Sequence, residues 1–516
     1  MNNMRIGGLA SGMDIDKIVG DLMKVERAPI DKLKQKKQLL EWQRDAYRDM
    51  NRLLNDLDKH IFDGVMRQST FLQKKVTSSN ENVVTATAVS SNANQTVEIS
   101  NITQLATAAR WTSGEIKNTS NNAVDVNASL ASQFGAGVPT TLSFKVIKPG
   151  STTEETVNIS IDPSTDTLNS LINKLNGHAT LGVRAFYDDF TKKMVITKNE
   201  TGAGSSIEIT AGEDFLQNQL KFQVQTIGTS PNQQYFLQQD AGTGQNAKFT
   251  INGLETERTS NTFTINGMTY TLKNTYAGTV TITSTTNTDS IFNSIKSFVD
   301  KYNETIDEIN KKLKETRYRD YQPLTDEQRE QLTEKQAEKW EEKAKSGILR
   351  GDSILSNALS NMRLALYRKV EAAPEGFQQL AQIGITTTPN YLEGGKLLID
   401  EAKLRQKIEE NPDGVYRLFS NNGEGNAKGI VLQLRDEIKK TIKSIEDKAG
   451  NTLKATNQYI IGKSILDIDT RISAAEDRLK QVEDRYWKQF SAMEKAVQRA
   501  NSQSMYLMNA FGGGAQ

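Results

Sequence analysis

The sequence predicts an α+β multidomain protein: a helical coiled-coil base from both chain ends, with antiparallel β-rich outer domains inserted between them. Apolar residues recur at helical spacing near both ends of the 516-residue chain, whereas the middle alternates with a period of two, as half-buried strands do. The charge density changes too, because residues 81–289 hold 13 Lys and Arg and 18 Asp and Glu, against 64 and 63 in the whole chain. We therefore expect the chain to leave a helical base, build sheet-rich modules and return.

The length predicts three or four domains, at a usual size of about 150 residues each. We expect a terminal coiled-coil domain of residues 1–45 and 475–516, and a helical base domain of residues 46–85 and 286–474. A β-rich domain of residues 86–110 and 237–285 follows, and residues 111–236 form the outermost β-rich domain.

The chain begins with a glycine-rich arm, RIGGLASGMD, that runs into an amphipathic helix. Asp14, Asp16 and Lys17 interrupt any continuous apolar core, so the arm does not have the pattern of a secretory signal. No window approaches the ~18 uninterrupted apolar residues that a membrane helix requires, and the mean hydropathy is -0.57. These features predict a soluble chain that keeps its arm.

A second helix is expected from Pro29 to about Phe62, because Ala28-Pro29 should break the first helix and proline suits a first helical turn. Apolar residues recur along it every seven positions: Leu33, Leu40, Tyr47, Leu54 and Ile61. The companion column is polar at first and apolar later: Lys36, Gln43, Met50 and Leu57. This pattern predicts a half-formed seam whose first part is wetter or is completed by another chain.

The C-terminal region carries a longer heptad pattern, with positions alternately three and four residues apart and all but two of them apolar. They are Ile465, Ile468, Ile472, Ala475, Leu479, Val482, Tyr486, Gln489, Met493, Ala496, Ala500, Gln503, Leu507 and Ala510. A single helix cannot bury such a seam alone. We expect the N-terminal helix to share it.

The middle of the chain contains several predicted hairpins. In FTINGMTYTL the dipeptide Asn266-Gly267 tolerates the positive φ of a type I′ turn, and a second FTING begins at Phe249. The segments TLSFKVI and TVNISI predict another strand pair. Between the hairpins, STDTLNSLINKLNG predicts a helix with Asp166 as its N-cap and Gly177 at its end.

Few residues offer catalytic or metal chemistry. The chain has no cysteine and two histidines, His60 and His178, without metal-like spacing. Asp188-Asp189 could supply two carboxylates, but a hairpin turn explains the pair better. The net charge of +1 gives no reason to expect nucleic acid or a membrane as partner. We predict no enzyme activity, no catalytic residue, no cofactor and no metal.

The segment TDEQREQLTEKQAEKWEEKAKSG predicts a highly charged helix. Thr325 and Gln328 form a capping box at its start, and Gly347 stops it. The charge run indicates a solvated helix face, with a partner-binding helix as the alternative.

Four segments in order resemble the bacterial flagellar filament cap family, also called hook-associated protein 2. They are RIGGLASGMDIDKIVGDLMKVERAPIDKL, FVDKYNETIDEINKKLKETRYRDYQPLT, GGKLLIDEAKLRQKIEENPDGVYRLF and MEKAVQRANSQSMYL. DTLNSLINKLNG with the following VRAFYD resembles the repeat of the outer domains of flagellins and caps. The resemblance covers both ends and much of the helical base.

The resemblance implies a secreted, extracellular structural protein at the tip of the bacterial flagellum. It implies export through the type III flagellar export apparatus with an export chaperone, and a homo-oligomeric ring, a pentamer, with the terminal helices as legs. The ring retains flagellin subunits at the filament end and promotes their folding and polymerisation. The alternative is a surface adhesin that binds glycans through the Thr/Asn-rich β domains.

We expect the heptad residues of both ends to make the self-assembly and filament contacts. These are Leu33, Leu40, Tyr47, Leu54, Ile472, Leu479, Val482, Tyr486, Met493 and Leu507. Because a leg must release and rebind as each subunit is added, the half-polar seam between Leu33 and Tyr47 suits this function better than a perfect zipper.

Overall fold

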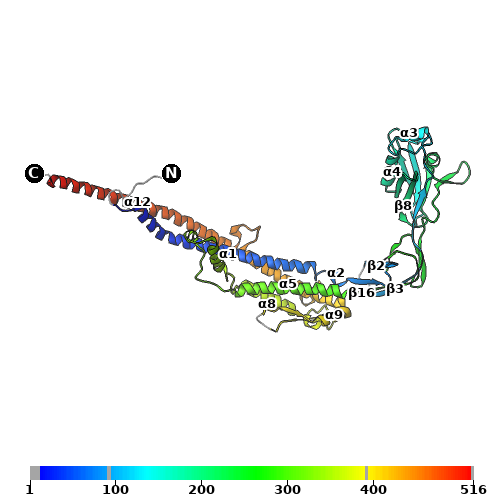
Figure 1. The fold of residues 1–516 in the computed structure, drawn as a ribbon. Helices are drawn as coiled ribbons and strands as arrows, with labels where there is room; N and C mark the ends of the chain where they lie inside the picture. Colours follow the sequence, from blue (N-terminus) through cyan, green and yellow to red (C-terminus); the bar gives the residue numbers. More distant parts are fainter. Residues whose placement is uncertain (1–11, 90–93, 390–392, 513–516) are drawn as a thin grey trace. The chain divides into compact units, whose positions relative to one another are not determined.

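A computed structural model describes residues 12–89, 94–389 and 393–512 of the chain. It divides into two compact units, a helical unit of Met1–Leu72 with Thr288–Gln516 and a β unit of Gln73–Asn287. The predicted fold class is confirmed, because helices from both ends form one unit and antiparallel sheets fill the middle (Figure 1). The predicted four-part division into domains stays a prediction.

The helical unit is built around two very long helices, α1 and α12, which lie side by side and antiparallel (Figure 1). Its helices are α1 (Ile15–Asp63), α2 (Gln68–Phe71), α5 (Thr288–Lys314), α6 (Asp326–Glu330), α7 (Glu334–Lys345), α8 (Ser353–Tyr367), α9 (Glu401–Glu410), α10 (Pro412–Ser420), α11 (Ile430–Ala449) and α12 (Ile460–Gly512). A short hairpin of β17 (Ile385–Thr387) and β18 (Leu397–Ile399) completes the unit.

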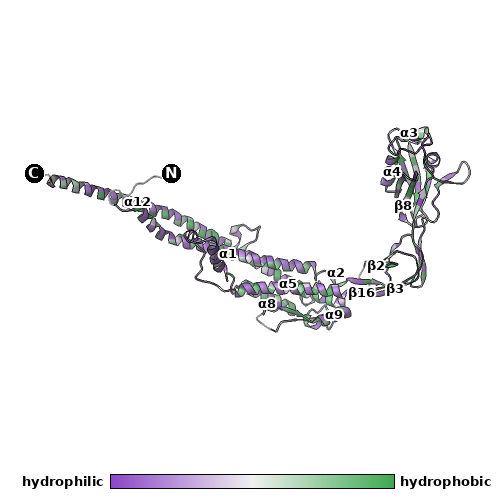
Figure 2. Ribbon diagram, viewed as in Figure 1, coloured by the Kyte–Doolittle hydropathy of each residue, from purple (hydrophilic) through white to green (hydrophobic). Residues whose placement is uncertain are grey.

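The second half of α1 lies in the core of the helical unit. Leu54, Leu57 and Ile61 are completely buried, and they pack with apolar residues of α5, α8 and α11. Figure 2 shows green apolar residues along these helices, interrupted by purple polar ones, as expected for helices that bury one face. The heptad spacing in the second half of this helix therefore predicted the face that the structure buries.

The predicted helix break at Ala28-Pro29 is wrong, because α1 runs without interruption from Ile15 to Asp63 with Pro29 inside it. A proline inside a helix lacks the N–H that would bond the carbonyl four residues earlier. That carbonyl belongs to Val25, which is 73% exposed, so water can satisfy it. Met23 and Ile30 on either side are buried, and this packing offsets the cost of the proline.

The β unit consists of antiparallel sheets with two separate hydrophobic cores. One core contains residues between Val83 and Ala106 and between Ala247 and Ile282. It involves a five-stranded sheet in the order β1-β16-β3-β12-β13 and a three-stranded sheet in the order β14-β15-β2. The strands are β1 (Lys74–Ser78), β2 (Val84–Ala88), β3 (Gln95–Gln104), β12 (Ala247–Ile251), β13 (Leu254–Arg258), β14 (Thr262–Ile265), β15 (Met268–Leu272) and β16 (Tyr276–Thr286).

The other core contains residues between Ala109 and Leu237. It involves a five-stranded sheet in the order β10-β11-β9-β5-β6, a three-stranded sheet in the order β4-β8-β7 and two helices. These elements are β4 (Ala108–Thr112), α3 (Leu130–Phe134), β5 (Thr141–Ile147), β6 (Glu154–Ser160), α4 (Leu168–Gly177), β7 (Val183–Asp188), β8 (Lys193–Thr201), β9 (Ser206–Ala211), β10 (Val224–Ile227) and β11 (Gln234–Leu237).

The predicted hairpins are confirmed. Asn266 and Gly267 have φ of 49° and 75° between β14 and β15, as a type I′ turn requires. The second FTING joins β12 to β13, and β5 pairs with β6. The N-cap expected at Asp166 is wrong, because Thr167 caps α4 and accepts a hydrogen bond from the Ser170 amide. Asp166 instead accepts from the Ser170 hydroxyl and the Lys174 ammonium.

The charged helix expected from Thr325 to Gly347 is two helices. The Thr325–Gln328 capping box is confirmed and starts α6, but α6 ends at Glu330. A second capping box at Thr333 and Gln336 then starts α7. Thr333 lies where a single helix would need helical backbone, and its side chain favours a new N-terminus there. We call residues 315–351, between α5 and the N-cap of α8, the insert.

Candidate assembly surface

The exposure of the heptad positions of α12 rises from the start of the helix to its end. Ile465 and Ile468 are 5% and 2% exposed, and Ile465 belongs to the core of the helical unit. Ile472, Leu479, Val482, Tyr486 and Met493 are half-buried. Every residue from 498 to 509 is exposed. The heptad pattern thus continues along the whole helix. Within the described chain, however, other residues cover only its first part.

A small hydrophobic cluster lies where the start of α1 packs against α12. Ile15, Val19 and Met23 of α1 are buried there. The residues of α12 that pack on them are Leu479, Val482, Tyr486, Trp487 and Phe490. The Tyr486 hydroxyl also donates to Glu26 Oε1 at 3.1 Å, which sets the antiparallel register. We call this group the distal cluster.

Beyond the distal cluster, α12 exposes four consecutive apolar residues. Met505, Tyr506, Leu507 and Met508 are 62%, 75%, 53% and 74% exposed. Since successive residues of a helix point about 100° apart, these four side chains surround the helix axis. A helix that is apolar all round is normally buried. One partner face cannot cover this segment, so it needs neighbours on more than one side.

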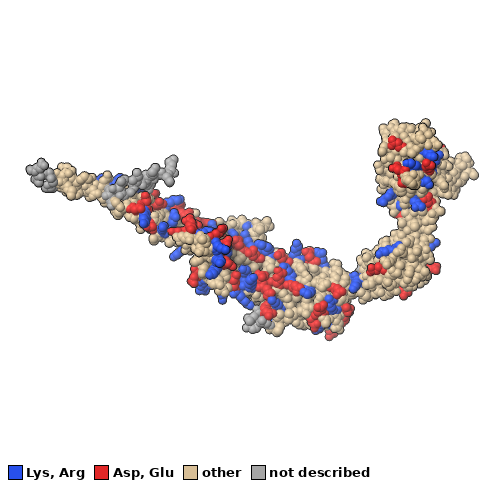
Figure 3. Space-filling model, in the orientation of Figure 1, with Lys and Arg blue, Asp and Glu red and all other residues tan. Residues whose placement is uncertain are grey.

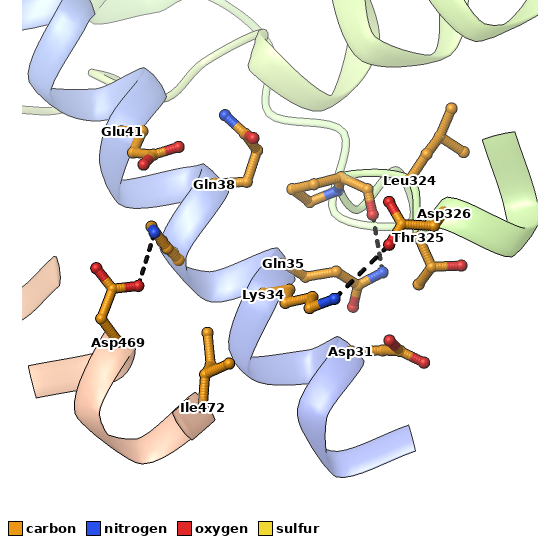
Figure 4. A pocket seen from close by; sticks show the side chains of 12 residues that line it. Asp31, Lys34, Gln35, Gln38, Glu41, Leu324, Thr325, Asp326, Asp469 and Ile472 are labelled. Atoms are coloured by element: carbon orange, nitrogen blue, oxygen red, sulfur yellow. Dashed lines mark hydrogen bonds and ion pairs between the residues drawn. The ribbon is translucent and has the colours of Figure 1, made fainter. Parts of the chain in front are cut away.

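The middle of the helix pair is polar and carries a groove of about 380 Å³ (Figure 4). Lys37 Nζ of α1 lies 2.6 Å from Asp469 Oδ1 of α12. On the other side, Gln35 Nε2 donates to the Pro323 carbonyl at 2.8 Å, and Lys34 Nζ lies 3.7 Å from Asp326 Oδ2. The groove thus lies between α1, α12 and the start of the insert, and charged or amide side chains form most of its lining.

Two of the expected contact residues are fully buried within the helical unit. Tyr47 and Leu54 are 0% exposed. The Tyr47 hydroxyl donates to the carboxylate of Asp352, which also accepts the backbone N–H groups of Ile354 and Leu355 at the start of α8. Burial, followed by the hydrogen bond to Asp352, raises the pKa of Tyr47 far above its ordinary value. In this conformation Tyr47 and Leu54 expose no surface to a partner. Their contacts instead stabilise the core of the helical unit.

The structure places the other expected contact residues along the helix pair. Leu33 and Leu40 are half-buried on α1, and Lys36 between them is exposed. Leu479, Val482 and Tyr486 lie in the distal cluster, and Leu507 lies in the exposed apolar segment. Their assembly role stays a prediction.

Sequence reasoning missed the residues of α1 that complete the distal cluster. Ile15, Val19 and Met23 recur every four positions, which is a helical signal. The heptad count began at Leu33, so it left them out. It also left out Trp487 and Phe490, which lie next to the heptad positions. Met505, Tyr506 and Met508 were left out as well, because only the structure shows that they are exposed.

Figure 3 shows charged atoms closely spaced over the helical unit and sparse over the β unit. Within the described residues, no group of three or more Asp, Glu and His could hold a metal ion. No helix in the described part of the chain has an apolar stretch that could span a membrane.

A multidomain chain whose ends pair as long helices, with antiparallel β domains between them and an apolar helix end exposed, is organised as a structural protein. The comparisons with known proteins specify the family. The model of the flagellar hook-associated protein 2 N-terminus matches residues 11–109, and that of its C-terminus matches residues 244–502. The chain belongs to the flagellar hook-associated protein 2 family.

Individual relatives agree with this family. The flagellar hook-associated protein 2 of Halalkalibacterium halodurans is 36% identical over 98% of this chain and 100% of its own length. That of Thermotoga maritima is 28% identical over 72% of this chain and 56% of its own. The crystal structure of the D1-D2-D3 domains of the flagellar cap protein FliD from Escherichia coli covers 82% of this chain and 99% of its own, with a TM-score of 0.56 and 22% identity. This structure supports the fold.

Proposed function

We propose that this chain caps the distal end of a bacterial flagellar filament, outside the cell. As an oligomer it retains exported flagellin there and promotes the folding and polymerisation of flagellin for filament elongation. Membership of the flagellar hook-associated protein 2 family supports this function, and so does a relative that matches along its whole length. The observation in this chain that carries the proposal is the exposed apolar segment of α12.

The apolar segment suits a leg that docks on the filament end. Four apolar side chains around one helix need several neighbours to cover them. The end of a helical lattice of subunits offers such neighbours, because an incoming leg can lie between adjacent subunits. A lone partner helix would cover only one side.

The polar middle of the α1–α12 pair suits a leg that must release and rebind. Exposed or partly exposed ion pairs such as Lys37–Asp469 contribute only about 0–1 kcal/mol each. The pair therefore holds its register there with little apolar burial. A fully apolar zipper would resist the rearrangement that accompanies each added subunit.

The partners in this proposal are other copies of the chain, in a pentameric ring, and the flagellin subunits of the filament end. Export requires the type III flagellar export apparatus and an export chaperone that binds the chain before export. No comparison supports the alternative of a glycan-binding adhesin.

Complementation of cells that lack their own copy tests the function. The variant replaces Met505, Leu507 and Met508 by serine. We expect filament growth to be lost and flagellin to appear in the medium, because the leg can no longer be covered by its neighbours. The control is Leu453→Ser, which changes a 91% exposed residue of the same unit and should leave filaments intact. Normal filaments with the triple variant would contradict the proposed docking role of α12.

Light scattering tests the ring. The full chain should give a discrete oligomer made of whole rings, with a multiple of five copies if the ring is pentameric. A chain that ends at Phe490 keeps the distal cluster but loses the exposed segment. If ring assembly depends on that segment, the truncated chain should lose the ring and have the mass of at most two copies. An unchanged oligomer would instead place the ring contacts elsewhere.

A further inference from the structure

The hairpin of β10 and β11 forms one edge of the five-stranded sheet β10-β11-β9-β5-β6 in the β unit. The strand order places β10 at the edge, with β11 as its neighbour. Gln225, Thr226 and the turn that follows are exposed, and Ile227 is 47% exposed. In Figure 1 the hairpin projects from the β unit as a green loop.

The backbone of β10 directs hydrogen-bonding groups away from the sheet. The Gln238 amide donates to the Gln223 carbonyl at 2.8 Å, so residue 223 faces β11. Facing alternates along a strand, and Gln225 and Ile227 therefore also bond to β11. Val224 and Thr226 point their N–H and C=O groups outward, where no described residue bonds to them.

The β10 edge has none of the charges that usually protect a free edge. Lysines and other charged side chains on edge strands discourage pairing with another chain. The other edges of the two five-stranded sheets carry them: Lys74 and Lys75 on β1, Glu154 and Glu155 on β6, and Glu255, Glu257 and Arg258 on β13. No charged residue occurs from Phe222 to Gln239. Figure 3 shows this projection without blue or red atoms.

We propose that β10 pairs with β10 of a second copy of the chain, antiparallel and around a twofold axis through Gln225. In this register Val224 of one copy lies opposite Thr226 of the other, and their outward groups form four hydrogen bonds. Gln225 lies opposite Gln225 of the second copy. A twofold contact brings the same surface of the two copies together. A charged residue at its centre would therefore face the same charge on the second copy and be repelled by it. An edge without charges meets this requirement.

This contact is separate from a closed ring. A ring requires head-to-tail contacts, whereas a twofold contact joins copies in pairs. It would join one ring to another or two free chains. Val224–Ile227 also lies in residues 110–243, between the two ranges that the family models match, so the pairing does not rest on the family match or on the proposed capping function.

Cysteine cross-linking of the full chain tests the pairing directly, because the chain contains no cysteine of its own. Opposed residues that do not exchange hydrogen bonds have Cα atoms about 4.5 Å apart, within the range of a disulfide. Gln225→Cys should therefore give a covalent dimer on a non-reducing gel after mild oxidation. The matched control is Asn158→Cys, an exposed position on β6 at the opposite edge of the same sheet, which should stay at the background level.

Two results would overturn the pairing. One is the absence of a Gln225→Cys dimer, or an equal yield with Asn158→Cys. The other is a dimer that forms only when the two variants are mixed, because that would place β10 against β6 in a head-to-tail contact.

Charge exchange gives a second, non-covalent test. Gln225→Lys and Gln225→Glu each place like charges opposite each other, and the exposed position should leave the fold intact. In light scattering, each variant alone should have half the mass of the unsubstituted protein, whatever the ring size. An equimolar mixture should restore the full mass. If both variants keep the full mass, the twofold contact is refuted.

Discussion

The two halves of α1 belong to one continuous helix, yet they are held in different ways. From Tyr47 to Ile61 the helix packs against α5, α11 and the start of α8, and we call this part of the helical unit the base. The residues that face its core, Tyr47, Met50, Leu54, Leu57 and Ile61, are at most 6% exposed. From Ile15 to Gln43 it packs chiefly on α12, with polar contacts to the insert. The continuity of a helix therefore says little about its local stability, which depends on how many elements cover it.

The polar residues of the two halves also differ in their surroundings. In the base, Tyr47, Asp352 and Lys448 join α1, α8 and α11 in one compact group. In the outer half, Lys37–Asp469 and Lys34–Asp326 lie around an open groove (Figure 4). Water competes for the second set but is largely excluded from the first.

The largest effect should come from opening a cavity in the base. Leu54→Ala removes a side chain that is 0% exposed, and we expect a loss of about 2–5 kcal/mol in the free energy of unfolding, measured with denaturant. Leu33→Ala changes a half-buried residue of the same helix and should cost less than half as much. Equal losses would mean that both halves belong to one cooperative core.

Removing the shared carboxylate of the base should come next. Asp352→Ala leaves the Tyr47 hydroxyl without its acceptor, removes the ion-pair partner of Lys448 and removes the N-cap of α8. We expect a loss of about 2–3 kcal/mol in the free energy of unfolding. Ser353→Ala is the matched control beside the cap, and thermal unfolding of both variants measures the difference. A loss below that of Ser353→Ala would show that the group is not needed.

Alkaline pH should weaken the base through Tyr47. Because burial raises the pKa of Tyr47, the unfolded chain releases this proton near pH ~10 while the folded chain keeps it. Its contribution is complete below that pH and is lost as the pH rises, by up to ~1.4 kcal/mol per pH unit. Tyr47→Phe should reduce the slope of stability against pH above 10, leaving the share of Tyr302, whose pKa burial also raises. An unchanged slope would contradict this assignment.

A substitution in the distal cluster should act locally. Val19→Ala removes two methyl groups from a residue that is 2% exposed, worth ~1.5 kcal/mol, so amide exchange near Val19 should become about tenfold faster. The midpoint of global unfolding should stay unchanged, because the base unfolds separately. Val25→Ala, at a 73% exposed position of the same helix, is the control. A fall in the global midpoint would join the two halves into one unit.

The smallest effect should come from the ion pair beside the groove. Asp469→Ala removes the partner of Lys37, and both side chains are partly exposed, so we expect a change below ~1 kcal/mol in the free energy of unfolding. Salt titration of the unsubstituted protein should show a similarly small change. A loss as large as that of Asp352→Ala would show that the groove excludes water.

Much of the local structure could be predicted because it depends on neighbouring residues. Asn266-Gly267 specifies its turn through backbone preference, and Thr325 with Gln328 specifies a helix start. Proline 29 has the same kind of local preference, but packing of Met23 and Ile30 outweighs it. Local rules succeed where no distant contact opposes them.

The candidate assembly surface was predictable only in part. Heptad spacing found Leu479, Val482, Tyr486 and Leu507, but it could not separate them from Tyr47 and Leu54, which have the same spacing. Spacing indicates that a residue faces something. It does not indicate whether that neighbour is the same chain or another.

The amino-acid sequence was enough to specify the fold class, the coiled-coil character of both ends, the sheet-rich middle and the family. These are local or cumulative properties of composition, period and motif. The register of α1 against α12, the burial of Tyr47, the exposure of Met505–Met508 and the free edge of β10 became visible only in the folded chain. Each of these depends on which distant segments cover a surface, and contacts between residues far apart in the chain decide that cover.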